Sequence, residues 1–137
     1  MINSSDFDFS FSGLKTAVLY LLKDLEKKYA IAELCAPISY EFQNAVCEVL
    51  VAKTIRAAKK YGAKSVIIGG GVAANMMLRE SLGKALKNYL PVISYCLPPI
   101  SLTGDNALMI ALVAYFSGKK IAWNKIRALA NLRLDKK

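Results

Sequence analysis

The chain contains no histidine. Ser–His–Asp and Cys–His nucleophilic sites both depend on an imidazole base, so neither can form within these 137 residues. Metal sites that use imidazole ligands are excluded for the same reason. A hydrolase or metal centre of these kinds would need residues from outside this chain.

Cysteine is scarce, and its spacing is uninformative for metal binding. The three thiols are Cys35, Cys47 and Cys96, and no two of them have C-x-x-C spacing. An odd number of scattered cysteines argues against a zinc knuckle and against a disulfide framework. Reduced thiols fit a cytoplasmic protein best.

Long hydrophobic runs are also missing. The longest one, Ala107 to Phe116, has ten residues, whereas a membrane-spanning helix needs about twenty. We therefore expect this run to be a buried helix, and we expect no membrane partner. The segment from Met1 to Phe11 carries acids and no apolar core, so it does not resemble a signal peptide. Because hydrophobic residues make up 55% of the chain, we expect one folded domain.

Acidic residues are few, with 10 against 19 basic ones and a formal net charge of +9. Between Lys119 and Lys137 seven basic residues face one acid, Asp135. We divide the chain into a lobe, residues 1–118, and a basic tail, residues 119–137, with a short helix expected around Trp123. The tail could neutralise RNA phosphates, or it could be a solvated, lysine-rich surface.

Hydrophobic periodicity predicts an α/β layer architecture with a short, parallel or mixed sheet. Ser12 is expected to cap the first helix, and Pro37 to lie in the first turn of the second, which ends before Gly62. The expected helices cover residues 12–29, 37–61, 76–86 and 105–116, and the expected strands cover residues 7–11, 64–68 and 91–96. The last two strands are expected to be buried and parallel.

A glycine-rich loop follows the apolar run Val66-Ile67-Ile68. Gly69, Gly70 and Gly71 would let a ligand approach the backbone closely, and a helix N-terminus that follows favours an anion. Alternatively, the glycines form a tight turn that packs well. Asn75 could bind a ribose hydroxyl or an amide-like ligand, or it could be a solvated residue of the first helical turn.

A second polar loop ends at Asp105, before the fourth helical run. Its carboxylate could be a ligand for a hard or borderline cation, or it could cap the helix. One carboxylate does not make a metal site. Ligands of α/β sheets bind beyond the carboxyl ends of the strands, so we expect the loops at Gly70 and Asp105 to line one crevice.

Three segments occur in an order that is similar to one family. They are Asp8-Phe9-Ser10-Phe11-Ser12-Gly13-Leu14-Lys15-Thr16-Ala17, then Gly69-Gly70-Gly71-Val72-Ala73-Ala74-Asn75 with Leu78-Arg79, then Asp105-Asn106-Ala107 with Met109-Ile110-Ala111. Together they resemble the C-terminal part of the TsaD family, the tRNA N6-adenosine threonylcarbamoyltransferases, once described as O-sialoglycoprotein endopeptidases. The resemblance runs from about Asp6 to Gly118.

The resemblance implies the second lobe of an actin-like ATPase (ASKHA) fold. It implies transfer of a threonylcarbamoyl group from threonylcarbamoyl-AMP to N6 of adenosine 37 in tRNA. By this resemblance Asn75 contacts the adenylate, Gly70 and Gly71 border its nucleotide, and Asp105 binds one divalent metal ion, iron or zinc. Thr103-Gly104 stands where the family more commonly has Cys-Thr.

The same resemblance implies that much of the site is missing. The family's other metal ligands are two histidines of an H-x-x-x-H motif in the first lobe, and this chain has no such motif. We therefore expect the chain alone to be inactive, and assign it no catalytic residue.

The implied partners are tRNA and accessory proteins, including a catalytically inert paralogue. The alternative function is a non-catalytic interaction module of the same fold; a peptidase has no support without histidine.

Overall fold

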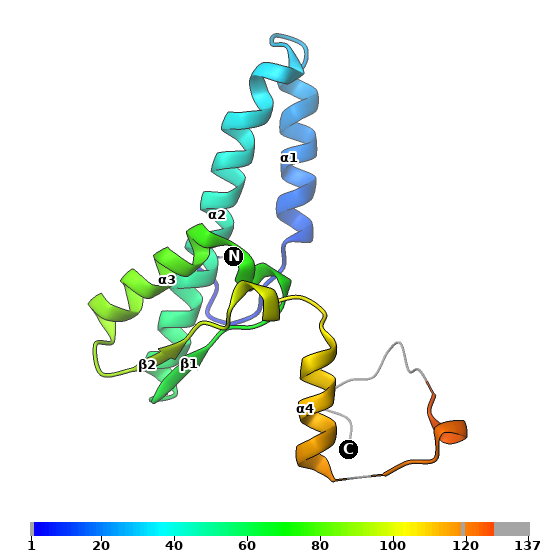
Figure 1. Cartoon of the computed structure of the whole chain (residues 1–137). Helices are drawn as coiled ribbons and strands as arrows, with labels where there is room; N and C mark the ends of the chain where they lie inside the picture. The colour runs from blue at the N-terminus through cyan, green and yellow to red at the C-terminus, as the bar shows by residue number, and fades with distance from the viewer. Residues whose placement is uncertain (1, 119, 128–137) are drawn as a thin grey trace. The chain divides into compact units, whose positions relative to one another are not determined.

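The computed structural model describes residues 2–118 and 120–127 (Figure 1). The chain divides into two compact units, Met1–Gly104 and Asp105–Lys137. The boundary between these units lies at the end of the second polar loop. The division into a lobe, residues 1–118, and a basic tail, residues 119–137, stays a prediction.

Two antiparallel helices, α1 (Ser12–Leu25) and α2 (Ile31–Lys60), form a hairpin in the first unit (Figure 1). Ser12 was expected to cap α1, but the cap is Phe11, and it makes no side-chain hydrogen bond. Pro37 was expected in the first turn of α2, but it lies inside that helix. Glu33 in the first turn favours an earlier start through the helix dipole. Pro37 removes one hydrogen bond inside α2, to the carbonyl oxygen of Glu33, which is an exposed residue.

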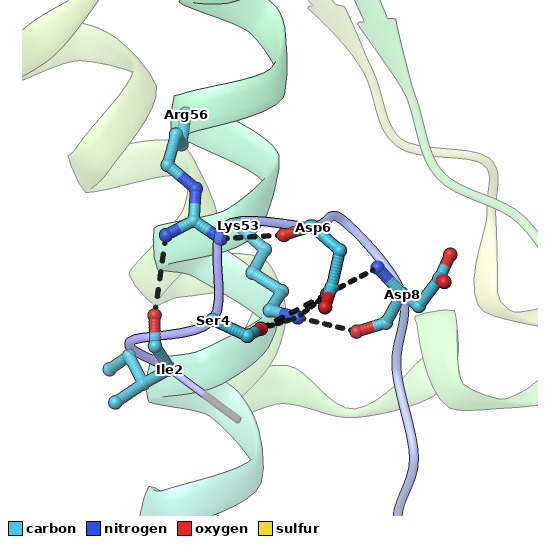
Figure 2. A network of polar contacts seen from close by, with 6 residues as sticks. All are labelled: Ile2, Ser4, Asp6, Asp8, Lys53 and Arg56. Carbon is cyan, nitrogen blue, oxygen red and sulfur yellow. Dashed lines mark hydrogen bonds and ion pairs between the residues drawn. The ribbon is translucent and has the colours of Figure 1, made fainter.

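The alternating residues 7–11 do not form the expected strand. A strand needs a neighbouring strand to pair its backbone groups, but here α2 supplies the partners (Figure 2). Lys53 donates to the carbonyl oxygen of Asp8, and Arg56 donates to that of Asp6 over 2.7 Å. Residues 2–11 therefore form a segment, which we call the strap, that is held against α2 through Ile2, Asp6 and Asp8.

The sheet of the first unit has two parallel strands, β1 (Ser65–Ile67) and β2 (Ser94–Cys96), with Val66 opposite Tyr95. The parallel pairing was predicted correctly, but the predicted burial was wrong. Every residue of β2 is exposed, and Ile67 of β1 keeps 75% of its surface accessible. An apolar strand becomes buried only when layers cover both faces of its sheet, and the described part of the chain does not supply two such layers.

The core of the first unit lies between α2 and α3 (Met76–Tyr89). Ile55 of α2 packs there with Leu82 and Leu86 of α3, and Val66 of β1 lies against them. Leu78, Leu82 and Leu86 are buried as the helical spacing of α3 predicted. A helix buries the residues of one face when they recur every three to four positions.

The second unit contains α4 (Ala107–Ser117) and a short 3₁₀ helix, η3 (Trp123–Lys125). Asn106 caps α4 and Gly118, with φ 59°, ends it. The prediction that this apolar run is buried was wrong, because none of its residues is buried. A helix that is apolar on all sides needs a large surrounding core, and the described part of its unit offers only η3. η3 occupies the place of the short helix expected around Trp123, while residues 119 and 128–137 of the basic tail lie outside the described residues.

Within residues 2–118 and 120–127, no helix has both the length and the apolar character needed to span a bilayer.

Candidate functional site

The glycine loop, which we define as Gly69–Asn75, follows β1 and contains a 3₁₀ turn, η1 (Gly71–Ala74). Gly70 has a φ of 80°, a left-handed conformation that favours glycine. A Cβ built on Gly69, Gly70 or Gly71 would meet no atom within 4 Å. The positive φ of Gly70 fits the tight turn, whereas within the described residues nothing packs closely against the three glycines. The loop leaves open space beside its backbone.

Asn75 is the cap of α3, and both ends of its amide are held by the protein. Its Oδ1 accepts a hydrogen bond from the backbone N–H of Leu78 over 3.0 Å. Its Nδ2 donates to Oε1 of Gln43 over 3.1 Å, and the Gln43 amide in turn donates to the sulfur of Met77 over 3.4 Å. Asn75 is half-buried, so the interpretation as a solvated first-turn residue is wrong. The amide instead has a fixed orientation.

Arg79 joins the glycine loop to the loop that follows β2. Its Nε donates to the carbonyl oxygen of Ala73, and its guanidinium also donates to the carbonyl oxygen of Pro98. Further along this second loop Thr103 is buried, with its hydroxyl bonded to the carbonyl oxygen of Ile100 over 2.7 Å. The loops after both parallel strands therefore lie side by side, as expected for loops at one edge of a sheet.

A cavity of about 460 Å³ opens between the helical hairpin and the glycine loop. Its polar lining includes Asn75, Gln43 and Ser39, together with the thiols of Cys35 and Cys47. The rest of the lining is aliphatic or aromatic and comes from α1, α2, η1 and α3: Val18, Leu22, Ile38, Phe42, Val46, Leu50, Val72 and Leu78. Burial raises the pKa of the Cys47 thiol, which keeps it protonated at neutral pH. The volume lies within the range of small-molecule sites.

Asp105 begins the second unit, directly after Gly104. It is exposed, and it does not cap α4, because the cap is Asn106, whose Oδ1 accepts from the N–H of Met109 over 3.0 Å. Within the described residues no three His, Cys, Asp or Glu side chains come together to hold a metal ion. One carboxylate does not fit the donor set of an iron or zinc site. The shared crevice for Asp105 and Gly70 stays a prediction, since they belong to different units.

A buried ammonium group holds the strap of residues 2–11 on α2 (Figure 2). Lys53 is 1% exposed, and its Nζ donates to Oγ of Ser4 over 2.9 Å and to Oδ1 of Asp6 over 2.8 Å. The hydrogen bond from Lys53, followed by that from Ser4, lowers the pKa of Asp6 from 3.8 to about 2. The strap is followed directly by α1, which begins at Ser12.

Sequence reasoning missed three residues of this region: Gln43, Lys53 and Arg79. Gln43 and Lys53 had a signal, because both are polar residues that fall between apolar positions of the same long helix. A buried polar residue needs a hydrogen-bond partner. The pattern therefore indicated that each side chain has a partner, but it did not identify that partner. Arg79 had no comparable signal, since its two acceptors are backbone carbonyls.

The comparison with known proteins decides the family. A family model described as TsaD, tRNA N6-adenosine threonylcarbamoyltransferase, matches residues 2–112. The chain belongs to the TsaD family. The resemblance inferred from the three motifs is confirmed, and a helical architecture with a small parallel sheet is consistent with a partial lobe of the fold that the family implies.

Curated relatives of the TsaD family carry the same description, tRNA N6-adenosine threonylcarbamoyltransferase. The Enterococcus faecalis protein is 42% identical over 120 residues, which cover 88% of this chain and 34% of the relative. The Listeria welshimeri protein is 44% identical over 90% of this chain and 37% of its own length. The Bordetella petrii protein is 46% identical over 83% of this chain and 32% of its own length. The chain thus spans about a third of the length of these relatives.

Proposed function

We propose that this chain supplies part of an enzyme that forms threonylcarbamoyladenosine in tRNA. In this reaction N6 of adenosine 37 attacks the carbamoyl carbon of threonylcarbamoyl-AMP. A C–N bond forms, the bond from that carbon to the phosphate oxygen breaks, AMP leaves and N6 loses a proton. Family membership and the names of the relatives support this assignment.

The observation that carries the proposal is the pair of amides beside the cavity. Asn75 and Gln43 line an apolar cavity of about 460 Å³ and are bonded to each other, so neither amide rotates freely. Carboxamides recognise purine edges and ribose hydroxyls through paired donors and acceptors. We assign the nucleoside portion of threonylcarbamoyl-AMP to this cavity, with Asn75 as a contact.

The glycine loop fits the phosphate portion of the same ligand. No atom lies within 4 Å of the Cβ positions of Gly70 and Gly71, so a ligand can reach the backbone there. Val72 of the same loop already lines the cavity. An adenylate that extends from the cavity over Gly71 would place its phosphate beside backbone N–H groups, which favour anions.

Asp105 is proposed as one ligand of a divalent ion whose other ligands lie outside this chain. It directly follows the loop that Arg79 ties to the glycine loop. A single carboxylate binds such an ion weakly, so no step of the reaction is assigned to the metal in this chain. The proposal predicts that the chain alone retains no stoichiometric iron or zinc after purification.

The chain alone is proposed to be inactive, because its sheet and α4 are uncovered. Both strands are largely exposed, and every described residue of α4 is accessible to solvent. Such apolar surface is ordinarily covered by further polypeptide. The remaining two thirds of the relatives' length is the polypeptide that we propose covers it.

The test is to co-express this chain with the part of the Enterococcus faecalis relative that it does not match. The pair is supplied with threonylcarbamoyl-AMP and a tRNA transcript, and threonylcarbamoyladenosine is measured by mass spectrometry of the digested RNA. We expect product from the pair and none from either part alone. An assembled pair that never forms product would reject the transferase assignment and favour the non-catalytic interaction module.

Asp105→Asn in the assembled pair tests the metal ligand. We expect lost metal retention and at least a hundredfold drop in product formation. Asn106→Ala is the matched control, since it removes a neighbouring polar side chain and the cap of α4 but leaves the carboxylate. Wild-type metal content in Asp105→Asn would refute the ligand role.

A further inference from the structure

Positive charge is concentrated in the second half of the first unit, apart from the basic tail. Between Val49 and Gly104 eight basic residues face one acid, Glu80. The first 48 residues, in contrast, carry more acids than bases. This charge therefore lies on the C-terminal part of α2, at Lys64 just before β1, and on α3.

Some of these cations meet exposed aromatic rings where α2 ends. Nζ of Lys59 lies 5.1 Å from the centre of the Tyr89 ring, and Nζ of Lys60 lies 5.9 Å from that of Tyr61. The Tyr61 ring is also 5.7 Å from the ring of Phe7, whose face Lys60 and Arg56 both approach. Lys59 and Lys60 are consecutive residues, so the two groups of contacts meet at the last turn of α2.

The rings of this surface face solvent rather than the core. Tyr61 is 71% exposed and Tyr89 is 63% exposed, and Lys59 and Lys60 are exposed as well. Two solvent-exposed aromatic rings close to ammonium groups suit a strand of nucleic acid, because bases stack on rings while cations neutralise phosphates. An apolar protein partner would instead favour an aliphatic surface with little charge.

We infer that Lys59, Lys60, Tyr61 and Tyr89 form an RNA-contact surface, which we call the α2-end surface. This inference rests on the proposed tRNA substrate. The surface lies at the start of β1, whereas the glycine loop lies at the end of that strand. It would therefore bind a part of the RNA that is distant from the reacting nucleotide. The surface would increase the affinity for RNA and take no part in the chemical step.

Binding of the purified chain to an unmodified transcript of a tRNA that reads codons beginning with A tests the surface. Affinity is measured by fluorescence anisotropy over a series of salt concentrations. Lys59→Ala with Lys60→Ala should weaken binding about tenfold and lower the slope of log affinity against log salt by about 1.5. If the alanine pair impairs folding, Lys59→Gln with Lys60→Gln keeps the aliphatic stems and answers the same question.

A matched charge control lies at the other end of α2. Lys27→Ala with Lys28→Ala removes two positive charges at the α1–α2 turn, about 45 Å away along the 30-residue helix. We expect this variant to stay within twofold of the wild type. Equal weakening by both lysine pairs, no weakening by either, or no binding by the wild type at low salt would each overturn the inference.

Stacking is tested separately from charge. Tyr61→Ala and Tyr89→Ala should each weaken binding by about fivefold or more, whereas the phenylalanine variants should bind like the wild type. Tyr20→Ala is the control, because Tyr20 is 62% exposed and has Lys23 over its ring at 5.9 Å. Tyr20 belongs to α1 and is not part of the α2-end surface. Loss in the Tyr20 variant equal to that in the Tyr61 variant would overturn the stacking role.

The same variants separate this inference from the transferase assignment. In the assembled pair, substitution of Lys59 and Lys60 should raise the KM for tRNA and leave kcat within twofold. An unchanged KM together with normal product formation would reject the surface but not the transferase. RNA binding that depends on the surface, in a pair that never forms product, would reject the transferase but not the surface.

Discussion

Asn75 and Gln43 hold each other's side-chain amides in place across the junction of the glycine loop and α2. Nδ2 of Asn75 donates to Oε1 of Gln43 over 3.1 Å, while Oδ1 of Asn75 accepts from the N–H of Leu78 over 3.0 Å. One residue therefore caps α3, links it to α2 and faces the cavity. A residue that orients a ligand must itself be oriented, and this arrangement supplies that condition.

Coupling between these two side chains is the first prediction. Asn75→Ala should lower the free energy of unfolding by about 1–2 kcal/mol, because both the cap and the contact with Gln43 are lost. Gln43→Met, which keeps the cap, should cost less. The double variant should be about 0.5–1 kcal/mol more stable than the sum of the single losses predicts. Urea unfolding measures all three.

Asn106→Ala is the control for this double-mutant cycle of Asn75 and Gln43. It removes a second asparagine cap, at the start of α4 in the other unit. Its loss should simply add to that of Gln43→Met. A coupling as large as that between Asn75 and Gln43 would show that the cycle measures global unfolding behaviour and not a direct contact.

The contrast between α3 and the strands shows what the sequence could determine. The spacing of Leu78, Leu82 and Leu86 gave the buried face of α3 correctly, since the partners of that face lie within the same unit. The β-branched residues around Val66 gave a parallel strand correctly, but not its exposure. Periodicity indicates which residues favour burial, whereas actual burial depends on the layers that cover them, and the described residues leave β2 exposed.

The candidate site divides in the same way. The positive φ of Gly70 and the capping role of an asparagine before α3 follow from local residue chemistry, which a sequence displays. The partner of Asn75 is 32 positions away in the chain. The strap could not be predicted either. The alternation of Phe7, Phe9 and Phe11 is typical of a β-strand and does not distinguish a strand from a segment held against a helix. Only the side chains of α2 decide between the two.

The second prediction separates Gly70 from Gly71. Gly70→Ala forces a side chain into the left-handed region at φ 80° and should cost about 1–2 kcal/mol of stability. Gly71→Ala meets no atom within 4 Å and lacks a positive φ, so stability should change by less than about 0.5 kcal/mol. If a ligand crosses the loop, Gly71→Ala should still weaken AMP binding by the assembled pair, as calorimetric titration would show. Unchanged binding would place the phosphate elsewhere.

The third prediction concerns the strap and pH. Contact with Lys53 lowers the pKa of Asp6 from 3.8 to about 2. A depressed carboxyl pKa stabilises the folded state above the unfolded value, and this contribution disappears as the pH falls through the folded value. As the pH is lowered from about 4 to about 2, the urea concentration at the unfolding midpoint of the wild type should therefore decrease. Asp6→Asn should be less stable at neutral pH and should lose less over that interval.

Asp8→Asn is the matched control for the strap, because only the backbone of Asp8 contacts Lys53. Its pH profile should follow that of the wild type. The carboxylate of Asp6 is 54% exposed, so salt should reduce the difference between Asp6→Asn and the wild type. A flat wild-type profile from pH 4 to pH 2 would show that the ion pair does not contribute to folding.

The last prediction uses the thiols to locate the nucleotide. Cys35 is exposed and lines the same cavity as Asn75, Cys96 is exposed on β2 and does not line that cavity, and Cys47 is buried. Iodoacetamide should therefore alkylate Cys35 and Cys96 quickly at pH 8 and Cys47 slowly, because the reactive species is the accessible thiolate. Saturating AMP should slow alkylation of Cys35 in the assembled pair and leave Cys96 unchanged, as peptide mass spectrometry would report. Protection of Cys96 equal to that of Cys35 would indicate a general tightening of the fold, and no protection of Cys35 would remove the nucleotide from the cavity.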